Sequence, residues 1–240
     1  MKELKNENNE LKNKQEKTEK EIEELKKENN KLKNKQEKAE KEIEEIKKIT
    51  NTIKEKEEKE KESIKNNDLY KSTIIKDEEE IKLLSNWINE NKEKKFKLLY
   101  KLSVDGDSIE TFHKKCDNKG PTLIIIKSSK GKRFGGYNPL SWDTTEKWKT
   151  DPHTFIFSLD TKKKYIIIKE NMKRYSSVGA SEYIGFGYYC SDLLIRDQCM
   201  SRNDNRTNGK ESAYNITKQY EFTGEENFTI DDYECYSVSF

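Results

Sequence analysis

The stretch FHKKCDNKGPTLIIIKSSKGKRFGGY, residues Phe112 to Tyr137, decides the fold of the larger part of this chain. Within it, Thr122–Lys127 and Lys132–Tyr137 are rich in apolar, β-branched and aromatic residues and read as two strands. Gly131 lies between them, where a tight turn needs a residue that tolerates an unusual backbone conformation. The stretch therefore predicts a β-hairpin, and Gly135 and Gly136 in its second strand indicate a bulge or a close backbone approach.

Similar short runs continue on both sides of this hairpin, separated by polar turns. They are Phe96–Leu102, Thr154–Leu159, Tyr165–Lys169, Asp192–Arg196 and Phe228–Val238. The segment Cys199–Lys210 is polar and without periodicity, so we expect an exposed loop there. Short strands with few helices predict a mainly β, α+β fold: a two-sheet antiparallel β-sandwich with flanking helices.

Two helices are expected beside these strands. Asp77 precedes three glutamates, which is typical of a helix N-terminus. The apolar residues that follow share one face, which predicts packing against the domain: Ile81, Leu84, Trp87 and Ile88. Asp107 or Ser108 is expected to cap a second, short helix that carries Phe112.

The N-terminal part of the chain has a different composition. Residues 1–65 consist largely of Lys, Glu and Asn and contain no aromatic residue, Gly, Pro or Cys, so they cannot bury a globular core. The segment Glu3–Glu23 recurs as Glu24–Glu44, a period of three heptads. With Leu4 at position d, most d residues are apolar as far as Ile53, whereas most a residues are Asn or Gln. This pattern predicts a coiled coil over residues 1–53, with the asparagines favouring a parallel dimer of defined register. A solvated single helix or a disordered charged tail are the alternatives.

The heptad pattern ends after Ile53, so residues 54–67 are interpreted as a charged linker, followed by a domain over residues 68–240.

A series of ordered motifs in this domain resembles the TLDc domain family. Leu98-Leu99-Tyr100, Ser103, Asp105 and Gly106 match its opening motif, and the Phe112–Tyr137 stretch contributes Phe112, His113, Cys116, Gly120, Pro121, Gly135, Gly136 and Tyr137. Trp142, Phe155–Leu159, Asp192–Ile195, Phe222-Thr223-Gly224, Glu225, Asn227, Phe228, Glu234 and Val238 follow in family order. The chain departs from the family near Ser181–Tyr189, where Glu182 and Tyr183 precede Gly185 and Gly187.

This resemblance implies two antiparallel sheets with flanking helices. It also implies a non-catalytic protein that acts through protein contacts in oxidative-stress resistance, with the soluble sector of the vacuolar proton-pumping ATPase as a partner. Ser103, His113 and Glu225 match polar positions of the family motifs that an apolar core does not require, so they are the candidate partner-binding residues. Self-association is expected through the coiled coil.

A redox enzyme is the alternative, because a Cys116 thiolate beside His113 could act as a nucleophile or react with peroxide. A scaffold acting through the coiled coil alone is a third hypothesis. We favour a structural, buried Cys116, because Cys is commonly a small buried residue.

The cysteines form no CxxC pair, and their spacing fits no zinc site: Cys116, Cys190, Cys199 and Cys235. We therefore expect no metal or cofactor.

Composition bounds the remaining possibilities. The formal net charge is +2 and no part of the chain is strongly basic, so nucleic-acid binding is not expected. The apolar runs are far shorter than the ~20 residues of a membrane-spanning helix. No secretory signal is visible and the cysteines suit a reducing compartment, so we expect a cytoplasmic protein, recruited to endolysosomal membranes only through a partner.

Overall fold

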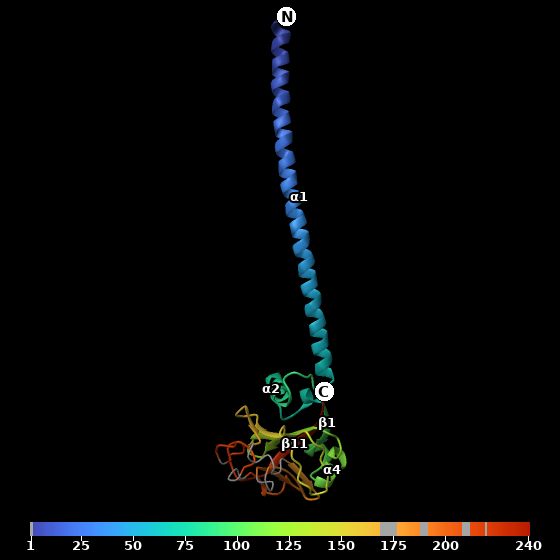
Figure 1. Cartoon of the computed structure of the whole chain (residues 1–240), viewed down its shortest axis with the longest axis vertical. Helices are drawn as coiled ribbons and strands as arrows, with labels where there is room; N and C mark the ends of the chain where they lie inside the picture. Colours follow the sequence, from blue (N-terminus) through green and yellow to red (C-terminus); the bar gives the residue numbers. More distant parts are fainter. Residues whose placement is uncertain (1, 169–176, 188–191, 208–211, 219) are drawn as a thin grey trace. The chain divides into compact units, whose positions relative to one another are not determined.

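The computed structural model describes residues 2–168, 177–187, 192–207, 212–218 and 220–240, and the chain divides into two compact units, Met1–Glu62 and Ser63–Phe240. Helix α1 (Lys2–Lys65) is continuous and unbroken (Figure 1). The absence of Gly and Pro and the abundance of Lys and Glu explain this continuity. No helix in the described ranges is both long and apolar enough to cross a membrane.

The apolar residues of α1 remain exposed to solvent. Between 45% and 64% of the surface is exposed for each of Leu11, Ile22, Leu25, Leu32, Ile43, Ile46, Ile49 and Ile53. The long helix expected for the N-terminal part is therefore present, and within one chain its apolar stripe has no cover.

The second unit contains two antiparallel sheets (Figure 1). The six-stranded sheet has the order β1-β11-β2-β3-β4-β5, with β1 (Lys95–Lys101), β11 (Ile230–Ser239), β2 (Thr122–Ser128), β3 (Arg133–Asn138), β4 (Phe155–Ser158) and β5 (Lys163–Ile166). The five-stranded sheet has the order β10-β9-β8-β7-β6, with β10 (Asn227–Phe228), β9 (Asn205–Arg206), β8 (Leu193–Arg196), β7 (Tyr183–Phe186) and β6 (Ser177–Ala180). The mainly β, two-sheet architecture with flanking helices is confirmed.

Strands β2 and β3 form the predicted hairpin. Gly131 has a φ of 76° and donates its N–H to the Ser128 carbonyl at 2.8 Å, which closes the turn. Gly136 pairs with Ile124, and a Cβ at Gly136 would lie 2.5 Å from the ring of Phe186 in the other sheet. The second strand of the hairpin therefore needs glycine where the Phe186 ring of the other sheet packs against it.

The larger core fills the space between the two sheets. Ile124 and Ile126 of β2 belong to it together with Phe186 and Leu193 of the second sheet. Alternate residues of a strand point to opposite faces, so these two isoleucines share the inner face of β2. The short helix α4 (Ile109–Cys116) adds Phe112 and Cys116, both fully buried, to this core.

A second core covers the opposite face of the six-stranded sheet. Leu123 and Ile125 pack there with Leu84 of α2 (Glu78–Ile88) and with Leu69 of the 3₁₀ helix η1 (Asp68–Lys71). As predicted, α2 begins at the Asp77 cap, whose carboxylate accepts the Glu80 N–H at 2.9 Å. Because both faces of β2 are covered, its apolar run shows continuous burial rather than alternation.

Three local predictions need correction. The segment Cys199–Lys210 is not simply an exposed loop, because its described part contains β9. Asn205 of this strand is fully buried, and its side-chain amide donates hydrogen bonds to the backbone carbonyls of Cys199 and Phe228. The run Phe228–Val238 is split between β10 and β11, which belong to different sheets. Ser108 occupies the N-cap of α4 without a side-chain cap bond, and the Asp107 carboxylate instead accepts the Met200 N–H at 2.8 Å.

A polar margin as candidate interaction surface

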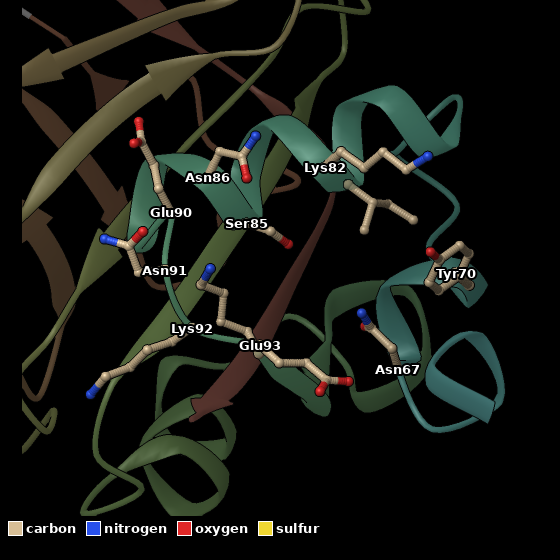
Figure 2. Close-up of a pocket in the computed structure, with 11 residues that line it drawn as sticks. Asn67, Tyr70, Lys82, Ser85, Asn86, Glu90, Asn91, Lys92 and Glu93 are labelled. Atoms are coloured by element: carbon tan, nitrogen blue, oxygen red, sulfur yellow. The ribbon is translucent and has the colours of Figure 1, made fainter. Parts of the chain in front are cut away.

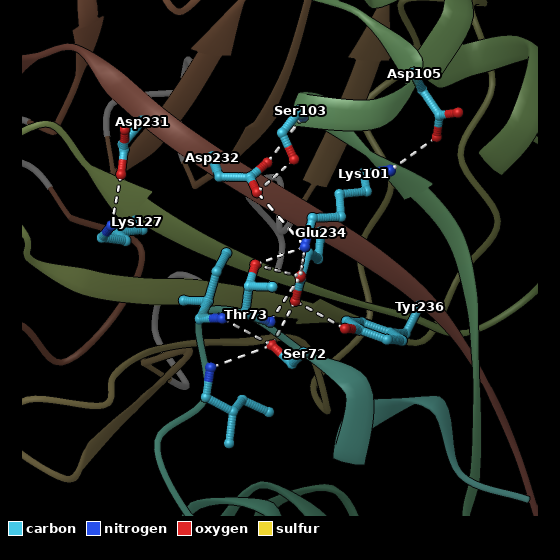
Figure 3. A network of polar contacts seen from close by, with 12 residues as sticks. Ser72, Thr73, Lys101, Ser103, Asp105, Lys127, Asp231, Asp232, Glu234 and Tyr236 are labelled. Atoms are coloured by element: carbon cyan, nitrogen blue, oxygen red, sulfur yellow. Dashed lines mark hydrogen bonds and ion pairs between the residues drawn. The ribbon is translucent and has the colours of Figure 1, made fainter.

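Glu234 of β11 is the buried centre of a polar network where strand β1 ends, opposite Lys101 (Figure 3). Its carboxylate accepts hydrogen bonds from the Lys101 ammonium at 2.8 Å and from the Tyr236 hydroxyl at 2.8 Å. It also accepts the Ser72 hydroxyl at 2.5 Å and the Thr73 N–H at 3.1 Å. Glu234 therefore fastens the segment after η1 to strands β1 and β11.

Burial alone would raise the pKa of Glu234. The hydrogen bonds from Lys101, Ser72, Tyr236 and Thr73 outweigh burial and hold the pKa below the ordinary value of 4.5. A carboxylate with this many donors stays ionised at neutral pH, and removal of a donor would leave an incompletely paired buried charge. We assign Glu234 a structural role beneath the surface that follows.

Three exposed or half-buried polar pairs line the same end of the sheet, and we call them the polar margin. Ser103 donates both its N–H and its hydroxyl to Asp232, at 3.0 and 2.8 Å. The other two pairs are ionic: Lys127 with Asp231 at 2.6 Å, and Lys130 with Glu225 at 2.6 Å. The margin thus includes two of the three candidate partner-binding residues, Ser103 and Glu225.

Strand topology explains why these residues lie at one end. Strand β11 is antiparallel to both β1 and β2. Its first residue, Ile230, pairs with Ser128 at the end of β2, and Glu234 pairs with Lys101 at the end of β1. The four-residue helix α3 (Leu102–Asp105) follows β1 directly and carries Ser103 and Val104. Val104 exposes 76% of its surface, the largest exposed fraction among the exposed large apolar residues of the described chain. Protein contact surfaces combine an apolar centre with a polar, solvent-accessible rim.

His113, the third candidate, lies in a different environment. It is buried on α4, with Nδ1 2.8 Å from an oxygen of Asp117 and Nε2 2.9 Å from the carbonyl of Ala180 in β6. Both ring nitrogens are thus engaged within the domain, and the ring links α4 to the second sheet. His113 does not belong to the polar margin.

Cys116 and Trp142 belong to the core between the sheets, together with Phe112 and Phe228. Cys116 is fully buried, and its thiol contacts that of Cys235 on β11. Burial, and then this contact, raises the pKa of Cys235 well above its ordinary value. Trp142 packs edge-on against Phe112 and Phe186 and donates its ring N–H to Thr122 at 2.8 Å. Cys190 lies outside the described residues.

A surface pocket of about 520 Å³ lies beside α2, between η1 and the segment 89–94 (Figure 2). Its lining is mostly polar and includes Lys82, Glu90 and Glu93. Lys94 is largely buried there, donates to the Asn89 carbonyl, and has a pKa lowered by burial. None of Ser103, His113 and Glu225 lines this pocket.

Sequence reasoning missed the partners that position the margin. Asp232 bonds Ser103 across 129 positions of sequence, and Lys101 reaches Glu234 across 133. The sequence offers only two consecutive aspartates, Asp231 and Asp232, near the start of β11, and such a signal does not identify the partner.

Comparison with known proteins places this arrangement in a family. The family model of the TLDc domain matches residues 69–239. The chain is 29% identical over 76 residues to "MTOR-associated protein MEAK7" of Danio rerio, covering 32% of this chain and 17% of the relative. It is 32% identical over 65 residues to the protein of that name from Gallus gallus, covering 27% and 14%. The matches therefore span less than a fifth of these relatives. The family model covers well over half of the chain, and the chain belongs to the TLDc domain family.

Proposed function

We propose that this protein is a non-catalytic TLDc interaction protein whose domain binds a protein partner through the polar margin. The proposed partner is the soluble sector of the vacuolar proton-pumping ATPase, as the family resemblance implies. The consequence would be altered pump assembly, organelle acidification and oxidant resistance. The name of the MEAK7 relatives associates those proteins with MTOR, which supports a protein partner for this chain without identifying it.

One observation carries this proposal: the chemistry-bearing residues are enclosed, whereas the margin faces solvent. Cys116 is fully buried and both nitrogens of His113 are engaged, so neither presents a reactive atom at the surface. The margin carries charges of both signs, and the exposed Val104 follows its residue Ser103 in α3. Such a surface suits recognition, in which charge complementarity sets specificity and an apolar contact adds affinity.

The proposal also includes self-association through α1 and a cytoplasmic protein that its partner brings to endolysosomal membranes. The apolar stripe of α1 supports self-association, because such a stripe is stable in water when a second helix covers it.

The test is binding of the full chain to the purified soluble sector of the pump. The variant Lys130→Glu/Glu225→Lys exchanges the two members of an ion pair, so it keeps the pair but reverses the charges that a partner meets. Combined with Val104→Asp, it should weaken binding by about tenfold or more, since like-charge contacts and a buried new charge each oppose association. Equal binding of this variant and the wild type would contradict the proposal.

A matched control keeps this result specific. Lys162 and Glu79 form another exposed ion pair, at 3.6 Å, outside the margin. The exchange Lys162→Glu/Glu79→Lys should leave binding unchanged. If it weakens binding as much as the margin variant does, general electrostatics rather than the margin governs the contact.

A further inference from the structure

The exposed apolar stripe of α1 has the residue types of a two-stranded coiled coil. Leu25 and Leu32 occupy d positions, and Ile22 and Ile43 occupy a positions. β-branched residues at a with leucine at d favour two parallel strands. All four side chains are about half exposed or more, so the stripe is unoccupied within one chain.

The charged residues beside this stripe identify what covers it. In a parallel, in-register pair, the residue at g of one helix faces the residue at e five positions further along the other. Five successive g and e pairs are opposite in charge: Lys14 with Glu19, Glu21 with Lys26, Glu28 with Lys33, Lys35 with Glu40, and Glu42 with Lys47. Both sides of a symmetric pair would carry this set, so no like charges would meet along these five heptads.

We propose that the partner of α1 is a second copy of this chain, parallel and in register. This inference rests on the proposed self-association and on the parallel dimer that the asparagines favour, and it adds the charge pairs that set the register. The g residues of one copy are opposite in charge to the e residues of a second copy, so a second copy of this chain pairs all of them and no other helix is required.

If one helix were shifted along the other by one heptad, most of the facing g and e residues would carry like charges. On one side of the pair, Lys14 would face Lys26, Glu28 would face Glu40, and Lys35 would face Lys47. On the other side, Lys14 would face Lys12, Glu21 would face Glu19, Lys35 would face Lys33, and Glu42 would face Glu40. Like charges that face each other repel, so the g and e charges destabilise the shifted register as well as stabilising the in-register pair.

The polar residues of the stripe select the same arrangement. In register, Asn29 faces Asn29 of the second copy, and each amide can bond the other. A one-heptad slip would place Asn29 opposite Ile22. An antiparallel pair would match a with d, so polar a residues such as Gln15 and Asn29 would face apolar d residues such as Leu25 and Leu32.

Contacts within α1 do not replace a partner. The ion pairs Lys17–Glu21, Lys27–Glu23 and Lys38–Glu42 span 3.2 to 4.0 Å between strongly exposed side chains. Exposed pairs of this kind contribute little, and they leave the apolar stripe in water.

The parallel arrangement has a functional consequence. Both chains would leave the coiled coil at the same end, so their TLDc domains would be tethered near one another. Two tethered domains can bind two copies of a partner site with an affinity that neither reaches alone.

The first experiment tests orientation and register in the full chain. Asn29→Cys places a thiol at an a position, and Asn34→Cys places one at the outward f position of the same helix. In glutathione buffer, two thiols are oxidised to one disulfide while oxidised glutathione is reduced to two thiols. Asn29→Cys should form the disulfide-linked dimer about tenfold faster or more, because only the a position brings the two thiols to a high effective concentration.

Sedimentation equilibrium of the same variants separates the two levels of the proposal. A dimer mass with equally slow cross-linking of both variants would overturn the register and orientation but leave self-association standing. A monomer mass at micromolar concentration would overturn both.

The second experiment tests the charge code. One variant carries Glu21→Lys, Glu28→Lys and Glu42→Lys at g, and the other carries Lys26→Glu, Lys33→Glu and Lys47→Glu at e. Each alone should be monomeric, and a mixture should form the heterodimer, because every repulsive pair then becomes attractive. Two variants that dimerise alone as the wild type does would show that these charges do not select the partner.

Discussion

Helix α1 and strand β2 both consist of uninterrupted secondary structure, but they use their apolar residues in opposite ways. In α1, Leu25 and Leu32 expose 64% and 59% of their surface. In β2, Leu123 and Ile124 are completely buried, on opposite faces of the strand. The β domain buries its apolar residues within one chain, whereas those of the helix stay exposed, and this difference is the basis for proposing that α1 pairs with a second copy.

The largest expected effect concerns the contact between the two sheets. Gly136→Val should lower the free energy of unfolding of the β domain by about 2–4 kcal/mol, because the new side chain meets the Phe186 ring in a filled core. Urea unfolding followed by tryptophan fluorescence measures this change, since all three tryptophans lie in the domain. Ala39→Val on α1 adds the same side chain to an exposed helix and should leave the domain's midpoint unchanged. Equal midpoints for Gly136→Val and the wild type would show that the two sheets do not meet at this glycine.

Alkylation should distinguish the two regions by rate. Cys116 is fully buried, so iodoacetamide at pH 7 should label it far more slowly than it labels the exposed thiol of Asn34→Cys on α1. Peptide mapping measures both rates in one sample, and unfolding in urea should equalise them. Fast, selective labelling of Cys116 in the folded chain, with peroxide consumption lost in Cys116→Ser, would favour the redox enzyme instead.

A smaller effect is expected at the buried carboxylate. Glu234→Gln should cost about 1–3 kcal/mol, because the Lys101 ammonium loses its closest carboxylate while the site stays enclosed. The pKa of Glu234 is lower in the folded state, so its contribution is present above the unfolded pKa of about 4.5 and is lost as pH falls through the folded value. The wild type should therefore lose stability below about pH 4.5 more steeply than Glu234→Gln. If the free energy of unfolding depends on pH in the same way for both proteins, Glu234 does not contribute to stability as an ionised carboxylate.

The smallest effect is expected at the margin's surface. Asp231→Asn removes an ion pair with Lys127 in which both side chains are 41% exposed or more. Exposed pairs contribute between about 0 and 1 kcal/mol and solvent screens them, so the urea midpoint should barely move. A large loss of stability would mean that the margin is part of the fold rather than a surface available to a partner.

The fold was largely predictable because its signals are local. The Asp77 cap, the spacing of Ile81 and Leu84, and Gly131 between two apolar runs each specify their element through neighbours in sequence. Strand β9 was not predictable, because the burial of Asn205 depends on carbonyls that a distant strand supplies. A short polar strand has no pattern that separates it from a loop.

The candidate site was predictable only in part, for the same reason. Motif positions gave Ser103, His113 and Glu225, but the sequence could not separate exposed residues from enclosed ones. His113 bonds Ala180 in β6, a strand that short-range patterns did not predict. Ser103 acquires its environment from Asp232, which is distant in sequence.

Light scattering of the full chain, compared with residues 68–240 alone, tests most directly the claim that one region is complete and the other needs a second copy. At micromolar concentration the account predicts twice the mass of one chain for the full protein, and a folded monomer for residues 68–240. A monomeric full chain, or a dimeric fragment, would contradict it.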